Sequence, residues 1–353
     1  MSFIQENAEL KDYTSLRIGG RAERLIHAEQ QDDLAAIISQ YRSQGPIWVL
    51  GDGTNCLISD KGLPGTVVLN HSGDIQKLGP TKFKVGSGVS WDDFIQKLIA
   101  ENLWGLEFTS GIPGGVGAAV VGNIAAYGHK VADCFTEATI LDASDGSVET
   151  WDKSRLNFDY RSSALQRPEN KDKVVLDASF ELSENPTSEL EYASALKLAE
   201  ELNLTPDTLV KRRQIIMETR RRADALFSKD NPQGPWTAGS FFRNPLIDQK
   251  QVELIIAHEE QTGKTKEEIL RQNQIHGQDK ARVSASHVLL AAGFKRGQSW
   301  GQVRLDPEHI LKVENMSGAS AKEIYDVVQE IVSTVKDKLG VELVPEVRFL
   351  GEF

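Results

Sequence analysis

Apolar and polar positions in the first half of the chain predict many strands and few helices. Between Leu34 and Tyr41 the apolar residues recur at helical spacing, so a helix is expected there. A second helix is expected after Ser90, which forms a capping-box pattern with Asp93. Short apolar runs bounded by turn residues predict strands over 25–28, 47–50, 66–70, 83–85, 136–141, 148–151 and 174–182. The runs at 136–141 and 148–151 flank a Ser-Asp-Gly turn and are expected to form a hairpin.

Helical periodicity is more frequent in the second half. The best-defined helix is expected over 321–339, where Ser320 and Glu323 form a capping box, an apolar stripe runs along one side and Gly340 ends the pattern. Further helices are expected over 196–202, 207–222, 253–259, 266–272 and 286–292, and strands over 303–305, 309–313 and 341–344. The change of pattern predicts a domain boundary near residue 185.

Composition and charge narrow the classes of function. The 353 residues carry a net charge of −11, which argues against a general nucleic-acid surface because such surfaces need clustered Lys and Arg. Cys56 and Cys134 stand far apart in apolar surroundings, which fits reduced thiols, and no Cys/His pair has the spacing of metal ligands. No leader pattern and no 18-residue apolar stretch are present. We therefore expect a soluble cytoplasmic protein without a metal site.

Two glycine-rich stretches are candidates for ligand binding. Residues 110–128 contain six glycines and no charged side chain, so the backbone can approach a bound group closely. Pro113 suits the first turn of a helix whose free N–H groups would face a phosphate or the edge of a flavin ring. The alternative is a Gly/Ala helix packed on a sheet, with Asn123 and Tyr127 as caps. The turn at 51–55 could wrap a phosphate or be an ordinary loop, and it matches neither GxGxxG nor GxxxxGK[ST].

Four polar features could carry chemistry. Arg161, flanked by aromatic residues, could clamp a carboxylate or form a surface salt bridge. The basic run 220–222 could meet a diphosphate or serve as favourable charge at a helix C-terminus. Ser240 follows small residues and precedes two phenylalanines, which suggests a strand edge at a pocket, but it lacks the GxSxG pattern of a nucleophile elbow. Glu346 follows a proline in an apolar run, and if buried it would need partners.

Seven segments, in this order, resemble the UDP-N-acetylenolpyruvoylglucosamine reductase family, flavoenzymes of peptidoglycan precursor synthesis. Each is weak alone, but the ordered set is specific and covers nearly the whole chain. The segments are 13–20 (YTSLRIGG), 50–55 (LGDGTN), 111–128 (GIPGGVGAAVVGNIAAYG), 158–162 (FDYRS), 238–245 (AGSFFRNP), 291–297 (AAGFKRG) and 345–351 (PEVRFLG).

The resemblance implies a fold and a cofactor. It implies an FAD-binding domain of the vanillyl-alcohol-oxidase/PCMH type over 1–185, with subdomains of about 1–75 and 76–185. A smaller α+β substrate-binding domain would cover 186–353, with 345–353 returning to the FAD domain. FAD is expected to be noncovalent, because the turn at 51–55 offers no histidine. The residues expected to hold FAD are Gly51, Asp52, Gly53, Thr54, Asn55, Gly111, Ile112, Pro113, Gly114, Gly115, Gly117 and Asn123.

The implied reaction is the NADPH-dependent reduction of UDP-N-acetylglucosamine enolpyruvate to UDP-N-acetylmuramate by a cytoplasmic enzyme, expected to be a monomer. By resemblance, Arg161 and Glu346 polarise the carboxylate and the enolate-like intermediate, and Ser240 gives the proton. The implied substrate-binding residues are Tyr160, Tyr192, Arg222 and Asn244, with Tyr192 matching a mobile tyrosine that closes over the diphosphate. Tyr192 could instead be an aromatic residue on a helix surface.

The chain departs from the family pattern at two positions. Ala223 stands where many relatives have a lysine, which puts diphosphate binding in doubt, and Ala125 replaces a glycine beside the flavin. Three other functions remain open. A flavin oxidase of the same fold would not need Ser240 and Glu346 in these motifs, a non-catalytic UDP-sugar-binding relative would be expected to lose them, and a purely structural protein would leave the glycine turns unexplained.

Overall fold

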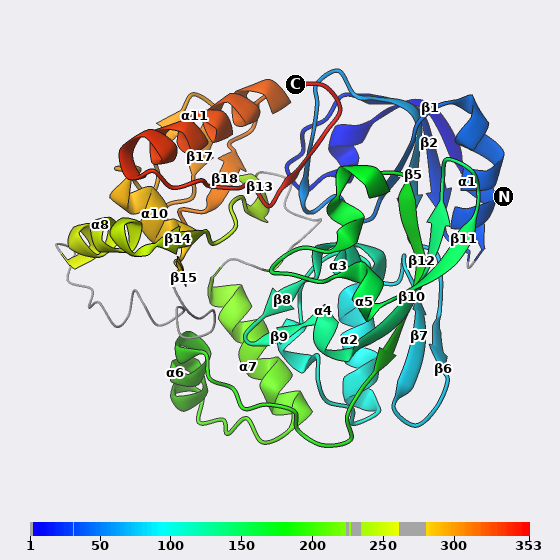
Figure 1. Cartoon of the computed structure of the whole chain (residues 1–353), viewed down its shortest axis with the longest axis horizontal. Helices are drawn as coiled ribbons and strands as arrows, with labels where there is room; N and C mark the ends of the chain where they lie inside the picture. Colours follow the sequence, from blue (N-terminus) through cyan, green and yellow to red (C-terminus); the bar gives the residue numbers. More distant parts are fainter. Residues whose placement is uncertain (1–2, 31, 224–225, 227–233, 261–279) are drawn as a thin grey trace. The chain divides into compact units, whose positions relative to one another are not determined.

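The computed structural model describes residues 3–30, 32–223, 226, 234–260 and 280–353. The chain forms two compact units (Figure 1). The first unit comprises residues 1–8, 21–53 and 63–228, and the second comprises 9–20, 54–62 and 229–353. The main division therefore lies at 228/229 and not at the expected 185/186, and two short N-terminal segments join the second unit.

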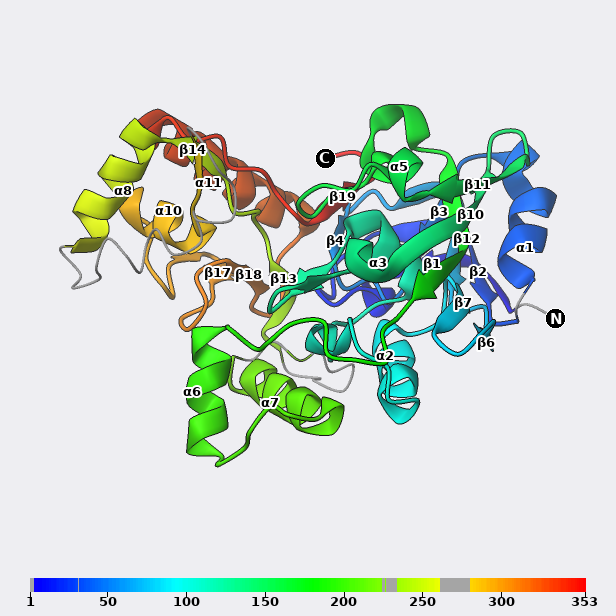
Figure 2. The same cartoon turned by 60° about the horizontal axis from the view of Figure 1, so that its bottom comes forward.

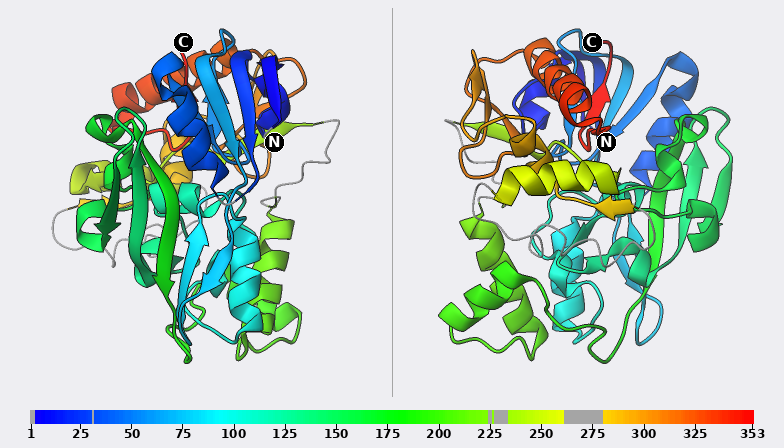
Figure 3. Two further views of the ribbon diagram at one scale, coloured as in Figure 1. Left: turned by 90° about the vertical axis from the view of Figure 1, so that its right-hand side faces the viewer. Right: turned by 60° about the vertical axis from the view of Figure 1, so that its left-hand side comes forward.

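One sheet of the first unit has the order β1-β2-β5-β3 and appears in blue in Figure 3. Its strands are β1 (Ile4–Glu9), β2 (Arg21–Ala28), β5 (Leu63–Asn70) and β3 (Ile47–Leu50), and both β2 and β3 run parallel to β5. Helix α1 (Asp33–Tyr41) packs Leu34, Ile37 and Ile38 into a cluster with Ile26 and Val68. Parallel strands joined through a helix bury both faces, which explains the nearly continuous apolar runs.

The second sheet of the first unit contains the expected hairpin. Its order is β11-β10-β12-β7-β6, with β10 (Phe135–Asp142) antiparallel to β11 (Val148–Asp152). The other strands are β12 (Lys173–Glu181), β7 (Lys82–Gly86) and β6 (Ile75–Lys77). Helices α2 (Trp91–Ala100) and α3 (Val116–Gly122) contribute to the core beside this sheet (Figure 2). Ser90 caps α2 as predicted, accepting a hydrogen bond from Asp93 N. Shorter elements are β8 (Ala125–Ala126), β9 (His129–Lys130), α4 (Val131–Cys134) and α5 (Lys153–Leu156).

Helices α6 (Ala193–Glu201) and α7 (Leu209–Arg222) belong to the first unit, which moves the boundary away from residue 185. The physical reason is a long-range buried ion pair. The Arg212 Nη1 atom lies 2.9 Å from Glu107 Oε1, and both side chains are buried. Ile215 and Ile216 of α7 pack in one cluster with Phe108. A change in local periodicity does not reveal such a contact, because its partners are about one hundred residues apart.

The second unit is built on the sheet β13-β18-β17-β16. Its strands are β13 (Trp236–Ser240), β18 (Lys312–Asn315), β17 (Val303–Leu305) and β16 (Ser299–Trp300), with a separate pair of β14 (Leu246–Asp248) and β15 (Lys280–Arg282). Helices α8 (Gln249–Glu260), α10 (Ala285–Ala291) and α11 (Ala321–Leu339) complete its core. The capping box and the left-handed Gly340 at the ends of α11 are confirmed. The helix expected over 266–272 lies outside the described residues.

The expected strand over 341–344 is wrong. Residues 341–344 have no regular structure, and the last strand is β19 (Arg348–Leu350), which pairs in parallel with β4 (Cys56–Ile58). The C-terminal tail thus does pair with a segment from the N-terminal part of the chain. That segment is counted with the second unit and not with the first.

In the part of the chain that the structure describes, no helix is both long and apolar enough to cross a membrane.

Candidate functional site

The two glycine turns of the first unit lie side by side. A Cβ atom added to Gly51 would stand 3.8 Å from Gly115 N, so the turn after β3 touches the turn before α3. A Cβ atom on Gly115 itself would come within 2.8 Å of Ser87 O, so no other residue fits there without displacement. The N–H groups of Gly51, Gly114 and Gly115 donate no hydrogen bond to the described residues. Adjacent unpaired amides without side chains fit an anionic group such as a flavin dinucleotide.

Several other amides of this stretch are paired within the protein. Helix α3 begins at Val116, so Pro113 precedes the helix and the expectation that it opens the first turn is wrong. The N–H groups of Val116 and Gly117 donate to Val89 O and Ser87 O, at 2.9 and 2.8 Å. Gly111 N donates to Asp92 Oδ1 at 2.6 Å. The first two amides of α3 are therefore paired within the protein, and the amides of Gly114 and Gly115 that fit a ligand lie just before the helix.

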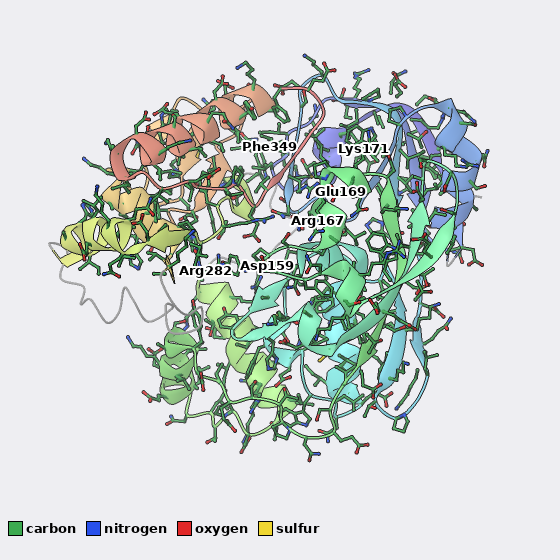
Figure 4. All side chains as sticks on the ribbon, in the orientation of Figure 1. Asp159, Arg167, Glu169, Lys171, Arg282 and Phe349 are labelled. Atoms are coloured by element: carbon green, nitrogen blue, oxygen red, sulfur yellow. The ribbon has the colours of Figure 1, made fainter. Side chains whose placement is uncertain are left out.

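Asn123 holds the turn that carries two other candidate residues. Its side-chain nitrogen donates to Asp159 O at 2.9 Å, and its side-chain oxygen accepts from Ala132 N at 3.1 Å. Asp159, labelled in Figure 4, starts the tight turn containing Tyr160 and Arg161, which closes through a bridge to Ser162. The buried Asn123 side chain thus positions Arg161 within the first unit. The expected contact of Asn123 with FAD stays a prediction.

The first unit gathers cationic and aromatic side chains near Arg161. Burial lowers the pKa of Arg220 on α7, and the nearby positive charge of Arg161 acts in the same direction. Burial also raises the pKa of Tyr127, whose ring meets Tyr192 edge-on with centroids 5.0 Å apart. A Cβ atom on Gly111 would stand 3.3 Å from Arg220 Nε. Two guanidinium groups and two tyrosines beside a glycine turn suit a ligand with carboxylate or phosphate groups.

Sequence reasoning singled out Arg222 in the basic run, whereas the structure places Arg220 on the inner side of α7. Arg222 is half-exposed, and its guanidinium pairs with Glu201 at 2.6 Å and with Glu218 at 3.0 Å. The helical repeat carries the signal that identifies Arg220, because this residue follows the buried Ile216 by four positions and so shares its face.

Ser240 and Glu346 are neighbours in the second unit, although about one hundred residues separate them in the chain. Glu346 N donates to Phe241 O at 2.7 Å, and Phe242 pairs with Pro345 in an antiparallel bridge. Asn55 also joins this group, since its side chain donates to Glu346 O at 3.3 Å. The fold thus brings the motif around Ser240, the motif around Glu346 and the end of the first glycine turn to one place.

A bulge in β13 sets the direction of Ser240. The pairing with β18 shifts between Thr237 and Ser240, so that three steps on β13 match two on β18. Gly239 occupies this bulge with φ of +79°, a conformation that side chains disfavour.

Asn244 makes structural hydrogen bonds in addition to the ligand contact expected of it. Its side-chain oxygen accepts from Ala285 N at 2.9 Å, and its carbonyl accepts from Arg282, labelled in Figure 4.

The predicted residues therefore fall into two groups, one in each unit. Tyr160, Arg161, Tyr192, Arg222 and most of the glycines belong to the first unit, and Ser240, Asn244, Glu346, Thr54 and Asn55 belong to the second. Asp52, in the first unit, lies 3.3 Å from the ring of His71.

Burial raises the pKa of the Cys56 thiol to about 12, and that of the Cys134 thiol also to about 12. Neither cysteine is therefore a reactive thiolate at neutral pH.

Comparisons with known proteins match both parts of the chain. A sequence model described as the FAD binding domain matches residues 22–152. A second, described as the C-terminal domain of UDP-N-acetylenolpyruvoylglucosamine reductase, matches residues 231–350. The fold is therefore a PCMH-type FAD-binding domain followed by the C-terminal domain of that family.

Full-length relatives agree with these matches. The UDP-N-acetylenolpyruvoylglucosamine reductase of Cutibacterium acnes is 30% identical, covering 98% of this chain and 90% of its own. The enzyme of the same name from Thermobifida fusca is 29% identical, over 98% of this chain and 97% of its own. The crystal structure of the reductase from Thermus caldophilus covers 99% of this chain and all of its own, with a TM-score of 0.63 and 24% identity.

Proposed function

The chain belongs to the UDP-N-acetylenolpyruvoylglucosamine reductase family, and we propose that it carries out the family reaction with Arg161, Ser240 and Glu346 around the reacting carbon. It is an FAD-dependent oxidoreductase of peptidoglycan precursor synthesis. We further propose NADPH as the hydride donor, UDP-N-acetylglucosamine enolpyruvate as the substrate, the cytoplasm as its location and the monomer as its working form. The single observation that carries the mechanism is the closeness of Ser240 and Glu346, which the fold brings together from remote motifs.

The cofactor and the protein have separate tasks in this proposal. Bound FAD supplies the chemistry of accepting hydride from the nicotinamide and delivering it to the enolpyruvyl carbon. The unpaired amides of Gly51, Gly114 and Gly115 would hold this anionic cofactor. Gly53, Thr54 and Asn55, which follow in the same turn, would also contact the cofactor.

Three side chains of the protein act on the substrate. Hydride delivery leaves negative charge on the neighbouring carbon and its carboxylate, and the Arg161 guanidinium stabilises that charge. Glu346 hydrogen-bonds to the same group when its carboxyl is protonated. The Ser240 hydroxyl gives its proton to the carbon, which completes the reduction. A serine is a weak acid, so its effect depends on position and on a supply of protons behind it.

The function is tested by following the visible spectrum of the purified protein without oxygen. NADPH should bleach the flavin absorbance, and UDP-N-acetylglucosamine enolpyruvate should restore it. The product formed from this substrate should be UDP-N-acetylmuramate, which mass spectrometry identifies. Bleaching without recovery on this substrate, but with recovery on oxygen alone, would indicate an oxidase of the same fold.

The flavin should leave the protein on denaturation. Residues 51–55 contain no histidine for covalent attachment, and the adjacent amides make noncovalent contacts. After acid precipitation and centrifugation, we expect the yellow colour and the mass of free FAD in the supernatant. Flavin absorbance that stays with the protein pellet would contradict noncovalent binding.

Arg222 provides a second test of substrate binding. If it meets the diphosphate, Arg222→Ala should weaken substrate binding by about 1.5–3 kcal/mol, or roughly 10- to 150-fold in Kd, and leave the flavin spectrum unchanged. Because Arg222 now pairs with Glu201 and Glu218, this role requires it to leave them. Glu201→Gln is the matched control, since it releases the arginine and should not weaken binding. An unchanged Kd for Arg222→Ala would show that Arg222 does not bind the diphosphate and only adds positive charge at the C-terminus of α7.

A further inference from the structure

Ser240 faces a buried group of charges on the same sheet. In the β13–β18 ladder Ser240 is paired with Lys312, and Thr237 is paired with Glu314. Residues directly opposite in an antiparallel pair point to the same face of the sheet. Val313, between Lys312 and Glu314, points to the other face and joins the apolar core. The bulge at Gly239 therefore returns Ser240 to the face that carries Lys312 and Glu314.

These charges are buried and paired with one another. Lys312 is 4% exposed, Glu314 is 3% exposed and Asp306 is 4% exposed. The Lys312 ammonium lies 3.5 Å from Asp306 Oδ2. Arg304, opposite Glu314 on β17, donates to Glu314 Oε2 at 2.9 Å through Nε and at 2.6 Å through Nη2. We call Arg304, Asp306, Lys312 and Glu314 the charged quartet.

The two carboxyl groups of the quartet differ in their affinity for protons. Burial raises the pKa of Glu314, and the negative charge of Asp306 raises it further. For Asp306 the cost of burial is outweighed by the backbone N–H groups of Glu308 and His309 and by Lys312, so its pKa is lowered. His309 is another titratable neighbour, and burial and Lys312 lower its pKa. Hydrogen bonds from Arg304 oppose the rise for Glu314, so the pKa of Glu314 lies above, and that of Asp306 below, the ordinary value of each carboxyl group.

Burying the charged groups of Asp306, Lys312 and Glu314 is costly, and apolar side chains on the same strands would pack without that cost. A role in the chemistry of Ser240, which lies opposite Lys312 in the ladder, would account for these buried charges. Resting on the proposed function, we propose that Lys312 is a positioning residue for Ser240, and that the quartet resupplies the proton that Ser240 gives to the substrate.

The proposed step conserves protons at each stage. When the Ser240 O–H bond breaks, its proton forms the new C–H bond of the product and leaves negative charge on Oγ. The ammonium of Lys312 stabilises that charge and returns a proton to Oγ. Lys312 then recovers a proton from Glu314 by way of Asp306, and solvent reprotonates Glu314. No electron transfer or further reactant is involved.

The test measures the two half-reactions separately by rapid mixing, as a function of pH. Lys312→Met should leave flavin reduction by NADPH near the wild-type rate and slow reoxidation by the substrate at least ~10-fold, in the range expected for lost proton transfer. Lys312→Arg keeps the charge that stabilises Oγ but does not release a proton, so it should recover only part of this loss. Glu314→Gln should alter the pH profile of the second step alone. Lys322→Met, at an exposed ion pair of the same unit, is the matched control.

Several outcomes would overturn the inference. The first is a rate of flavin reoxidation in Lys312→Met within about threefold of wild type. The second is equal slowing of flavin reduction and reoxidation in a folded variant. The third is a reoxidation rate in Lys312→Arg as low as in Lys312→Met. If Lys312→Met fails to fold because Asp306 is left unpaired, Lys312→Met with Asp306→Asn removes both charges and takes its place.

Infrared spectroscopy tests the quartet without turnover. Wild type should show a protonated-carboxyl band that persists above the pH range of ordinary carboxyl groups and that Glu314→Gln lacks. The absence of that band would show that Glu314 does not store the proton. If wild type itself fails to reduce the enolpyruvyl substrate, the proposed function fails, while the infrared result still decides whether Glu314 holds a proton.

Discussion

Ser240→Ala should slow reoxidation of the flavin by substrate ~10²–10⁴-fold, or about 3–5 kcal/mol of barrier, and leave its reduction by NADPH close to the wild-type rate. Reduction by NADPH needs no proton at the substrate carbon, whereas the second step requires one. Ser240 follows the bulge at Gly239 and directly precedes Phe241, whose carbonyl accepts a hydrogen bond from Glu346 N. Rapid mixing, first with NADPH and then with substrate, separates the two rates.

Ser299→Ala is a suitable control, because Ser299 is an exposed hydroxyl in β16 of the same sheet. It should leave both steps unchanged. Equal losses in both steps for Ser240→Ala would point to poor folding or poor FAD binding. A second step slowed less than about tenfold would remove Ser240 as the proton donor.

Arg212→Met should destabilise the protein by about 3–5 kcal/mol, the range for breaking one half of a buried ion pair. Glu107 would then stay buried without its guanidinium partner, which lies 2.9 Å away. Arg212 also donates to Ser188 O at 2.8 Å, and its guanidinium stands 4.8 Å from the Trp104 ring centroid. Urea unfolding followed by circular dichroism measures the effect.

Arg221 offers a matched comparison on the same helix. Its ion pair with Glu218 is solvent-exposed, so Arg221→Met should leave the urea midpoint of unfolding close to that of wild type. Combining Arg212→Met with Glu107→Leu should recover part of the loss, because the unpaired charge is then gone. A loss below about 1 kcal/mol in Arg212→Met would show that this pair does not hold α7 in the first unit.

Local patterns in the sequence predicted local elements well. The capping boxes and apolar stripe of α11 gave its bounds, and the turn between β10 and β11 gave the hairpin. The motifs also identified the family, because each stretch of glycines and polar residues is continuous in the chain. The failures were at 341–344 and Pro113, where hydrogen bonds to distant residues decide whether an apolar or glycine-rich run becomes a strand or a helix start.

The sequence by itself determined the secondary structure of the periodic segments, the flavin-binding family and the set of candidate residues, since these depend on neighbours a few positions apart. Only the tertiary structure decided how the candidates are used. It placed α7 in the first unit through the Arg212–Glu107 pair, turned Arg220 inward instead of Arg222, and joined Ser240 to Glu346. It also set Lys312 opposite Ser240. Each of these depends on contacts between segments far apart in the chain, whose free energy no local pattern records.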